Sequence, residues 1–123
     1  MRIAISTGGR GLDKFVDDRF GRCPYFLLCD SEDVQSTVEY KDNPALSAAG
    51  GAGIAAGEFM AKEKVEVLIT GSLGPNALLV IQAANIPAYT ASESMTLIEA
   101  ITAWKEGQLV QISEAGVAHA GER

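Results

Sequence analysis

Apolar residues in this chain follow two patterns: short continuous runs, and longer stretches in which they recur every three or four residues. Short runs bounded by turn residues predict strands, and recurrence at helical spacing predicts helices. The predicted strands are residues 3–6, 25–30, 34–41, 65–70 and 86–90. The predicted helices are residues 53–64, a segment that begins at Pro75, and a segment from Thr96 to Gly107. Thr96 and Glu99 predict a capping box at the start of the last helix. The order β-β-β-α-β-α-β-α is typical of an α/β domain.

The order of these elements restricts how the strands can pair. The polar turn at 31–33 favours an antiparallel hairpin between the second and third strands. A right-handed crossover through the helix at 53–64 places the fourth strand beside the first and parallel to it. Pro87 has no N–H group to donate, so we expect the fifth strand at an edge. The sequence thus predicts a mixed five-stranded sheet of order 3-2-1-4-5, with helices on both faces.

The chain length of 123 residues is typical of one domain. We place that domain at residues 1–107. Residues 108–123 are weakly patterned, and we expect them to form a mostly loose tail. The tail contains His119, the one histidine of the chain, which we expect to be solvated rather than to act as a base or a metal ligand.

The predicted topology brings four loops to one edge of the sheet. The first and fourth strands end there, and ligands of open α/β sheets bind at this position. Two of the loops open helices, at Gly53 and Gly74, where unpaired N–H groups favour an anion. Each glycine-rich helix start could also be ordinary turn chemistry, but their convergence predicts a binding site. Its predicted residues are Thr7, Gly8, Gly9, Arg19, Phe20, Gly21, Arg22, Gly50, Gly51, Gly53, Gly71, Ser72, Gly74 and Asn76.

The charge distribution indicates what kind of ligand such a site could take. Residues 1–22 carry five basic and three acidic side chains, whereas the whole chain has a formal net charge of −6. An acidic protein repels nucleic acid and anionic membranes, so a locally basic segment favours a small anion. The alternative is a chance scatter of solvated charges. Asp13, Asp17 and Asp18 could hold a hard cation, but they are more typical of a solvated loop.

The chain lacks the sequence motifs of several common enzyme classes. There is no Gly-x-Ser-x-Gly elbow, Walker loop or dinucleotide fingerprint, and Thr7-Gly8-Gly9-Arg10-Gly11 lacks the lysine and helix of a phosphate loop. We therefore predict that the chain is not an enzyme. No apolar run is long enough for a membrane span, and the first strand begins too early for a signal peptide. With two cysteines and no secretory signal, we expect a cytoplasmic protein.

Cys23 is the one candidate for a soft metal ligand. It follows Arg22, and a neighbouring cation lowers the pKa of a thiol and favours the thiolate that binds soft metals. Cys29 lies within a predicted strand and is expected to be buried. Two cysteines cannot complete the four-thiolate set of an ordinary iron–sulfur cluster. Arginines, backbone N–H groups and apolar packing would therefore have to hold most of any cluster.

Several motifs together carry a family resemblance over residues 1–110. They are Phe20-Gly21-Arg22, Pro24-Tyr25-Phe26, Asn43-Pro44, Gly50-Gly51-Ala52-Gly53-Ile54, Gly71-x-x-Gly74-Pro75-Asn76-Ala77, Ile86-x-x-Tyr89 and the helix start at Thr96. This pattern resembles the dinitrogenase iron–molybdenum cofactor biosynthesis family, which includes NifX-like carriers, the C-terminal domain of the cofactor-assembly enzyme and the molybdenum–copper orange protein branch. The resemblance implies a ribonuclease-H-like fold.

The resemblance also implies binding, storage or delivery of a metal–sulfur cofactor without catalysis, the metal being molybdenum with iron or copper. Many members have histidine where Arg19 stands, and another histidine where this chain reads Ser47-Ala48-Ala49. Cys23 often corresponds to alanine. Non-covalent binding of an anionic cluster therefore fits Arg19 and Arg22 better than histidine ligation.

The leading hypothesis is thus a cytoplasmic protein that binds an anionic metal–sulfur cluster. Its partners would be that cluster and a nucleotide-driven metal-delivery ATPase or cofactor-assembly protein, with no nucleic acid and no membrane. One alternative is a regulatory or scaffold domain that contacts such an ATPase without binding metal. A weaker alternative is a small enzyme that binds a phosphate ester.

Overall fold

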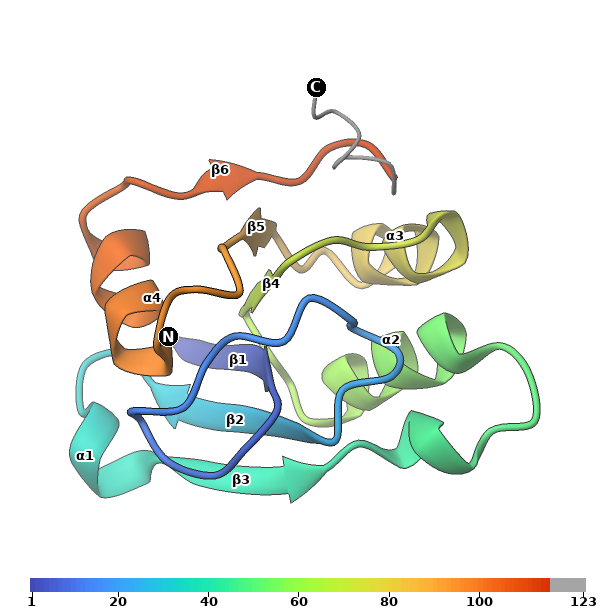
Figure 1. Cartoon of the computed structure of the whole chain (residues 1–123). Helices are drawn as coiled ribbons and strands as arrows, with labels where there is room; N and C mark the ends of the chain where they lie inside the picture. Colours follow the sequence, from blue (N-terminus) through green and yellow to red (C-terminus); the bar gives the residue numbers. More distant parts are fainter. Residues whose placement is uncertain (116–123) are drawn as a thin grey trace.

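A six-stranded sheet with β1 (Arg2–Thr7) near its middle organises the chain (Figure 1). The structure is a computed structural model, and it describes residues 1–115. The other strands are β2 (Tyr25–Asp30), β3 (Glu39–Asp42), β4 (Val67–Thr70), β5 (Ala88–Thr90) and β6 (Val110–Gln111). The helices are α1 (Val34–Thr37), the 3-10 helix η1 (Pro44–Ser47), α2 (Ala52–Lys62), α3 (Pro75–Ala83) and α4 (Leu97–Lys105). None of these helices is long and apolar enough to cross a membrane.

The sheet order is β3-β2-β1-β4-β5-β6. β1 pairs parallel with β4 and antiparallel with β2, and β4 pairs parallel with β5. The predicted fold class and the order 3-2-1-4-5 are therefore confirmed for the first five strands. Because β1 and β4 run in the same direction, Thr7 and Thr70 end at the same edge of the sheet.

Alternating side chains of the sheet face two separate apolar clusters, which makes the molecule three-layered. Ile3 and Ile5 of β1 pack toward α4, in the cluster that includes Leu97 and Ile101. Ala4 lies in the other cluster, together with residues of α2 and α3. Figure 1 shows α4 on one side of the sheet and α2 with α3 on the other. Burial on both faces explains why β4 has an almost wholly apolar sequence.

The predicted third strand, at 34–41, is wrong in its first half. Val34–Thr37 forms the short helix α1, and only Glu39–Asp42 forms β3. Val34 and Val38 are four residues apart, so one helical turn brings both against the core as well as a strand would. The Thr37 hydroxyl closes this turn by donating to the Asp33 carbonyl. The antiparallel pairing of β2 with β3 is confirmed.

The five-strand count and the edge position of the fifth strand are also wrong. Val110 and Gln111 form β6, which pairs antiparallel with β5, so this part of the expected loose tail is ordered. Pro87 is tolerated because it precedes β5 and uses only its carbonyl, which accepts a hydrogen bond from the Leu68 N–H. The predictions for residues 116–123, including His119, fall outside the described residues.

Candidate functional site

The N-termini of α2 and α3 are both left without a side-chain cap. Gly51, directly before α2, has a positive φ of 69°, a backbone conformation that favours glycine, and Gly74 precedes Pro75 at the start of α3. By contrast, Thr96 and Glu99 close the N-terminus of α4 with the predicted capping box. The N–H groups of a first helical turn have no partner within the helix. α2 and α3 therefore each offer backbone donors that α4 does not.

The segment between Asp17 and Pro24 crosses the carboxyl end of the sheet and faces these two helix starts. Arg19 forms a parallel bridge with Ser72, directly after β4. A Cβ on Gly71 would collide with the side chain of Asp18 and lie 2.7 Å from its Cα, so the close crossing requires glycine there. Gly21 packs in a similar way on the first residues of α2, where a Cβ would lie 3.2 Å from the Gly53 nitrogen.

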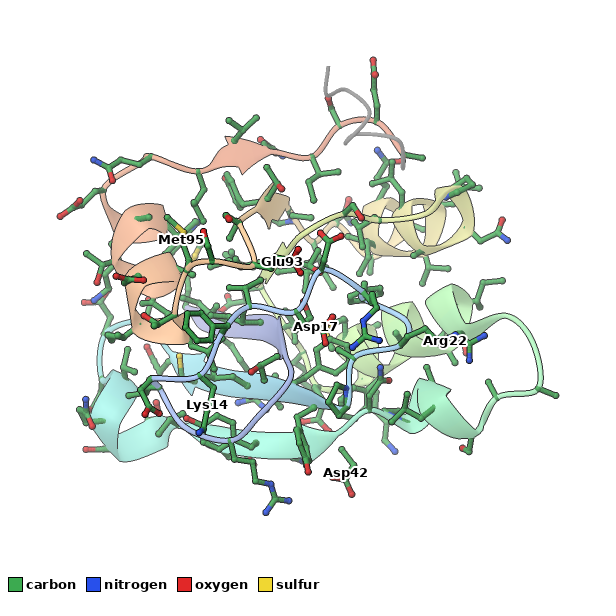
Figure 2. The ribbon with its side chains drawn as sticks, in the orientation of Figure 1. Lys14, Asp17, Arg22, Asp42, Glu93 and Met95 are labelled. Carbon is green, nitrogen blue, oxygen red and sulfur yellow. The ribbon has the colours of Figure 1, made fainter. Side chains whose placement is uncertain are left out.

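These elements enclose an open pocket of about 480 Å³, which we call the α2–α3 pocket. It brings together Arg19, Phe20, Gly21, Arg22, Gly51, Gly53, Ser72, Gly74 and Asn76 from the predicted site. Ala52, Ile54, Pro75 and Ala77 add apolar surface, and Asp18 adds a carboxylate. Arg22 is exposed and forms no ion pair with any residue of the described chain. It lies on the α2 side of the loop (Figure 2).

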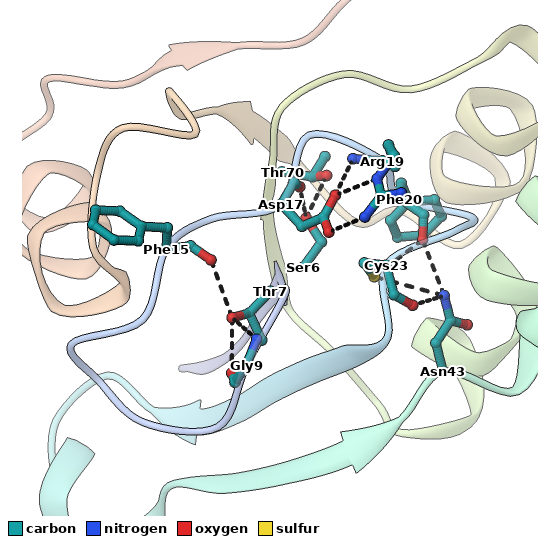
Figure 3. A network of polar contacts seen from close by, with 10 residues as sticks. All are labelled: Ser6, Thr7, Gly9, Phe15, Asp17, Arg19, Phe20, Cys23, Asn43 and Thr70. Atoms are coloured by element: carbon teal, nitrogen blue, oxygen red, sulfur yellow. Dashed lines mark hydrogen bonds and ion pairs between the residues drawn. The ribbon is translucent and has the colours of Figure 1, made fainter.

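Arg19 is less available than the sequence suggests, because Asp17 holds it. The Arg19 Nε and Nη2 atoms donate to the two carboxylate oxygens of Asp17 at 3.0 and 2.7 Å, and the Arg19 backbone N–H donates at 2.8 Å (Figure 3). Burial alone would raise the pKa of the Asp17 carboxyl, but these hydrogen bonds and the guanidinium charge hold the pKa below its ordinary value. Arg19 therefore carries a charge that is largely balanced.

Five predicted residues do not line the α2–α3 pocket. Gly8 and Gly9 line a second pocket of about 570 Å³, together with residues 14–17, Arg19 and Glu93. We call it the β1 pocket. Thr7 lies beneath it, and its hydroxyl bonds the Gly9 and Phe15 carbonyls. Gly71 is covered by Asp18, and Gly50 faces open space. The predicted single site is thus split, because residues 8–16 turn toward α4 before the chain returns to α2.

The structure contradicts the expected thiolate at Cys23. Its side chain is fully buried, and its Sγ donates to the Phe20 carbonyl at 3.4 Å. Burial and the charge of Asp17 raise the pKa of this thiol to about 12, although Arg22 is its neighbour in sequence. Arg22 and Cys23 point in different directions from the turn, one to solvent and one to the core. No group of three or more histidine, cysteine, aspartate or glutamate side chains within residues 1–115 could hold a metal ion.

Three polar residues that support the site, Asn43, Ser6 and Thr70, could not be assigned that role from the sequence. Asn43 is buried and donates to the carbonyls of Cys23 and Phe20. Ser6 and Thr70 share a buried 2.7 Å hydrogen bond between β1 and β4, and the Ser6 hydroxyl also bonds the Asp17 carbonyl. In the sequence, the Asn-Pro pair at 43–44 is visible only as part of the family motif. Two hydroxyls at the ends of adjacent strands were the available signal for the second group.

The fold and the pocket define an α/β protein with an open pocket at the carboxyl end of its sheet, lined by the N-termini of α2 and α3 and by Arg22. The chain belongs to the dinitrogenase iron–molybdenum cofactor family, whose sequence profile matches residues 1–107. The resemblance carried by the sequence motifs is thereby confirmed. Membership associates the chain with the binding or handling of a metal cluster.

Two solved structures support this assignment. The apo form of the orange protein from Desulfovibrio gigas is 37% identical, with a TM-score of 0.87 over 94% of this chain and 95% of that one. A putative NifB protein from Thermotoga is 32% identical, with a TM-score of 0.78 over 94% of this chain and 96% of that one. No curated protein matches the chain.

Proposed function

We propose that this chain binds an anionic metal–sulfur cluster in the α2–α3 pocket and stores or delivers it without catalysing a reaction. The observation that carries the proposal is the opening of two uncapped helix N-termini, those of α2 and α3, onto one pocket that also contains Arg22. Helix N-termini and a guanidinium both stabilise negative charge. The iron–molybdenum cofactor family favours molybdenum with iron, and the resemblance to the orange protein branch implies copper as the alternative second metal.

The electrostatics of the pocket favour a multiply charged anion. Arg22 contributes an unbalanced positive charge, and the first turns of α2 and α3 add backbone donors. Asp18 opposes them, but its carboxylate lies against Gly71 at the pocket wall. A charge pair at 4 Å near a protein surface is worth roughly 4 kcal/mol at an effective dielectric constant of 20, before desolvation and salt reduce it. Each of these positive groups stabilises a dianion or trianion more strongly than a monoanion.

The residues present fit a cargo held by non-covalent contacts. No set of three or more histidine, cysteine or carboxylate ligands exists in the described part of the chain, so residues 1–115 offer no complete set of metal ligands. It offers glycine backbone, a guanidinium and the apolar surfaces of Ile54 and Pro75, which suit polarisable sulfide ligands. A cluster that keeps its own ligands can enter and leave without breaking metal–protein bonds, as a carrier requires.

The proposal also includes a cytoplasmic location and a protein partner. Cys23 and Cys29 are both free thiols, which fits a reducing compartment such as the cytoplasm. A carrier needs a source and an acceptor for its cargo, so we propose a cofactor-assembly protein or a nucleotide-driven metal-delivery ATPase as partner. We do not assign a catalytic residue.

Anaerobic reconstitution tests the proposal. The apo protein is mixed with tetrathiomolybdate alone, with tetrathiomolybdate and copper, and with iron and sulfide, and is then separated from small molecules by gel filtration. We expect a stable visible absorption band and a fixed ratio of metal to protein in at least one mixture. Protein that emerges colourless and metal-free from all three mixtures would overturn the proposal. A partner captured equally well by metal-free, chelated protein would favour the scaffold alternative.

A further inference from the structure

Asn43 connects the Phe20–Cys23 turn, most of which lines the α2–α3 pocket, to the segment that leads into α2. Only 3% of its surface is exposed. Its Oδ1 accepts a hydrogen bond from the Ala45 N–H at 2.9 Å and caps η1, the helix that precedes α2. Its Nδ2 donates to the Cys23 carbonyl at 2.9 Å and to the Phe20 carbonyl at 3.3 Å (Figure 3). Both ends of the amide are therefore in use.

The turn that Asn43 holds is the one that carries Arg22. Within this turn, the N–H groups of Arg22 and Cys23 both donate to the Arg19 carbonyl, at 3.1 and 2.7 Å. These local bonds keep the turn in shape but do not fix its distance from α2. The Asn43 backbone N–H donates to the Pro24 carbonyl directly after the turn, and the bonds from the Asn43 side chain hold the turn itself, because they link two of its carbonyls to the segment that leads into α2.

A tight distance matters here because Gly21 lies against the first residues of α2. A Cβ on Gly21 would approach the Ala52 carbonyl carbon and the Gly53 nitrogen to 3.2 Å. A small outward movement of the turn would separate Arg22 from the N–H groups of α2, and an anion could then no longer contact both at short range. Hydrogen-bond energies fall steeply as the donor–acceptor distance grows.

We propose that Asn43 is a positioning residue for the α2–α3 pocket: it fixes the Phe20–Cys23 turn so that Arg22 and the N-terminus of α2 contact one anion together. This inference rests on the proposed function. Asn43 touches no part of the pocket lining except through the turn, so it acts by placing Arg22 rather than by binding the cluster.

Different atoms of the Asn43 side chain cap η1 and hold the turn, so substitutions can remove one role and keep the other. Asn43→Asp keeps an oxygen that can cap η1, since aspartate and asparagine cap helices equally well. It removes both donors and places a carboxylate against two carbonyl oxygens. Asn43→Ser also keeps a capping oxygen but is too short to reach the turn. Both variants should therefore release the turn while η1 stays capped, and the serine variant serves if the buried charge prevents folding.

Ser31→Ala is a matched control. Ser31 is 2% exposed, and its hydroxyl accepts a hydrogen bond from the N-terminal amine at 3.1 Å. It follows β2 at the opposite end of the sheet, because Asp30 pairs with Arg2 at the start of β1. Its replacement removes the hydrogen bond of another buried polar side chain without touching the pocket.

The experiment measures amide hydrogen exchange in the apo proteins by NMR, and tetrathiomolybdate affinity with and without copper at a temperature where every variant is fully folded. We expect faster exchange at Arg22 and Cys23 in both Asn43 variants, with Ala45 still protected. Affinity should fall about tenfold or more, as for residues that orient the ligands of a metal site. Ser31→Ala should leave both the exchange and the affinity at wild-type values.

Two outcomes overturn the inference without touching the proposed function. One is unchanged exchange at Arg22 and Cys23 in the Asn43 variants, and the other is unchanged affinity despite faster exchange. An equal loss of affinity in Ser31→Ala would show that general destabilisation is responsible, and would also overturn it. Failure of the wild-type protein to bind thiomolybdate is a distinct result, because it removes the proposed function itself.

Discussion

The two pockets beside Arg19 differ in how many of their polar groups are already satisfied. The β1 pocket is the larger, at about 570 Å³ against about 480 Å³. Beneath it, the Thr7 hydroxyl donates to the carbonyls of Gly9 and Phe15. Both carboxylate oxygens of Asp17 accept hydrogen bonds from Arg19. In the α2–α3 pocket, two helix starts lack side-chain caps and Arg22 lacks an ion-pair partner among residues 1–115. Unsatisfied donors, rather than volume, distinguish the α2–α3 pocket, for which we propose an anionic cargo.

Arg19 lines both pockets, but its charge is neutralised on the side of the β1 pocket. It lines each of them, yet its guanidinium is turned toward Asp17 on the β1 side. Figure 2 shows Lys14 and Met95 toward α4 and Arg22 toward α2, with Asp17 between them. The charge of the β1 pocket is balanced, because Glu93 and Asp17 face Lys14 and Arg19. The comparison therefore predicts that charge changes in the two pockets have unequal effects.

Reversing one charge in each pocket gives the largest expected effect. Arg22→Glu removes the unbalanced cation and places a carboxylate beside the N-terminus of α2, so we expect thiomolybdate affinity to fall about a hundredfold. Lys14→Glu makes the same change in net charge within the β1 pocket, and we expect a change of no more than about threefold because solvent and salt screen it. Binding is measured by absorption titration at fixed ionic strength.

Arg22→Lys refines this test, because it keeps the charge and loses the planar donor geometry. A partial loss in Arg22→Lys indicates that charge provides most of the binding. Equal losses in Arg22→Glu and Lys14→Glu would instead show that the anion responds to net charge alone. In that case the distinction between the two pockets would be wrong.

Releasing Arg19 from Asp17 should have a smaller effect in the opposite direction. Asp17→Asn removes the carboxylate that balances Arg19, which frees the guanidinium to turn toward the α2–α3 pocket. We expect affinity to rise about threefold. Asp13→Asn makes the same change in net charge on an exposed part of the same loop and should alter affinity less. A fall in affinity for Asp17→Asn would show that Asp17 holds Arg19 in its binding position.

The same variant gives a pH test of stability. The pKa of the Asp17 carboxyl is lower in the folded protein, so its contribution is complete above its unfolded pKa of about 3.9 and is lost as the pH falls through the folded pKa. Wild-type protein should therefore have the higher urea midpoint at pH 7, and the difference from Asp17→Asn should shrink below about pH 4. A difference that stays constant down to pH 2 would contradict the ion pair as its source.

The sequence predicted correctly those elements that interactions between neighbouring residues determine, and it missed those that depend on contacts with distant parts of the chain. The capping box of Thr96 and Glu99 and the order of the first five strands were predicted correctly, since short-range chemistry and the crossover rule determine them. The helix at Val34–Thr37 was missed because valines four apart suit either structure. β6 was missed because two residues, Val110 and Gln111, gain their strand conformation only by pairing with β5.

The candidate site was predicted as a set of loops but not as a geometry. Glycine-rich helix starts and arginines are visible in the sequence, and most of them do meet in one pocket. The sequence could not show that the chain between Thr7 and Val16 turns toward α4, which moves Gly8 and Gly9 into another pocket. Nor could it show that Arg22 and Cys23, adjacent in sequence, lie on opposite sides of a turn.

The last of these points leads to the smallest expected effect, which is no effect on binding. Cys23 lies behind the wall of the α2–α3 pocket, and its burial raises the pKa of the thiol to about 12, so the thiol stays protonated at neutral pH. Cys23→Ala should therefore keep thiomolybdate affinity within about twofold, whereas loss of a metal ligand typically costs far more. Iodoacetamide at pH 8 should leave the thiol of the folded protein unmodified, because only the thiolate reacts.

Cys29→Ala is the natural control for this variant, because Cys29 is equally buried but lies in the cluster on the α4 side of the sheet. The two alanine variants should bind alike. Rapid alkylation of Cys23 would show that its thiolate is accessible, and a loss of affinity in Cys23→Ala that Cys29→Ala does not share would make Cys23 a ligand after all. The α2–α3 pocket would then have to open toward the core when it binds its cargo. It would no longer be a preformed pocket that contrasts with the β1 pocket, whose polar groups are already hydrogen-bonded to one another.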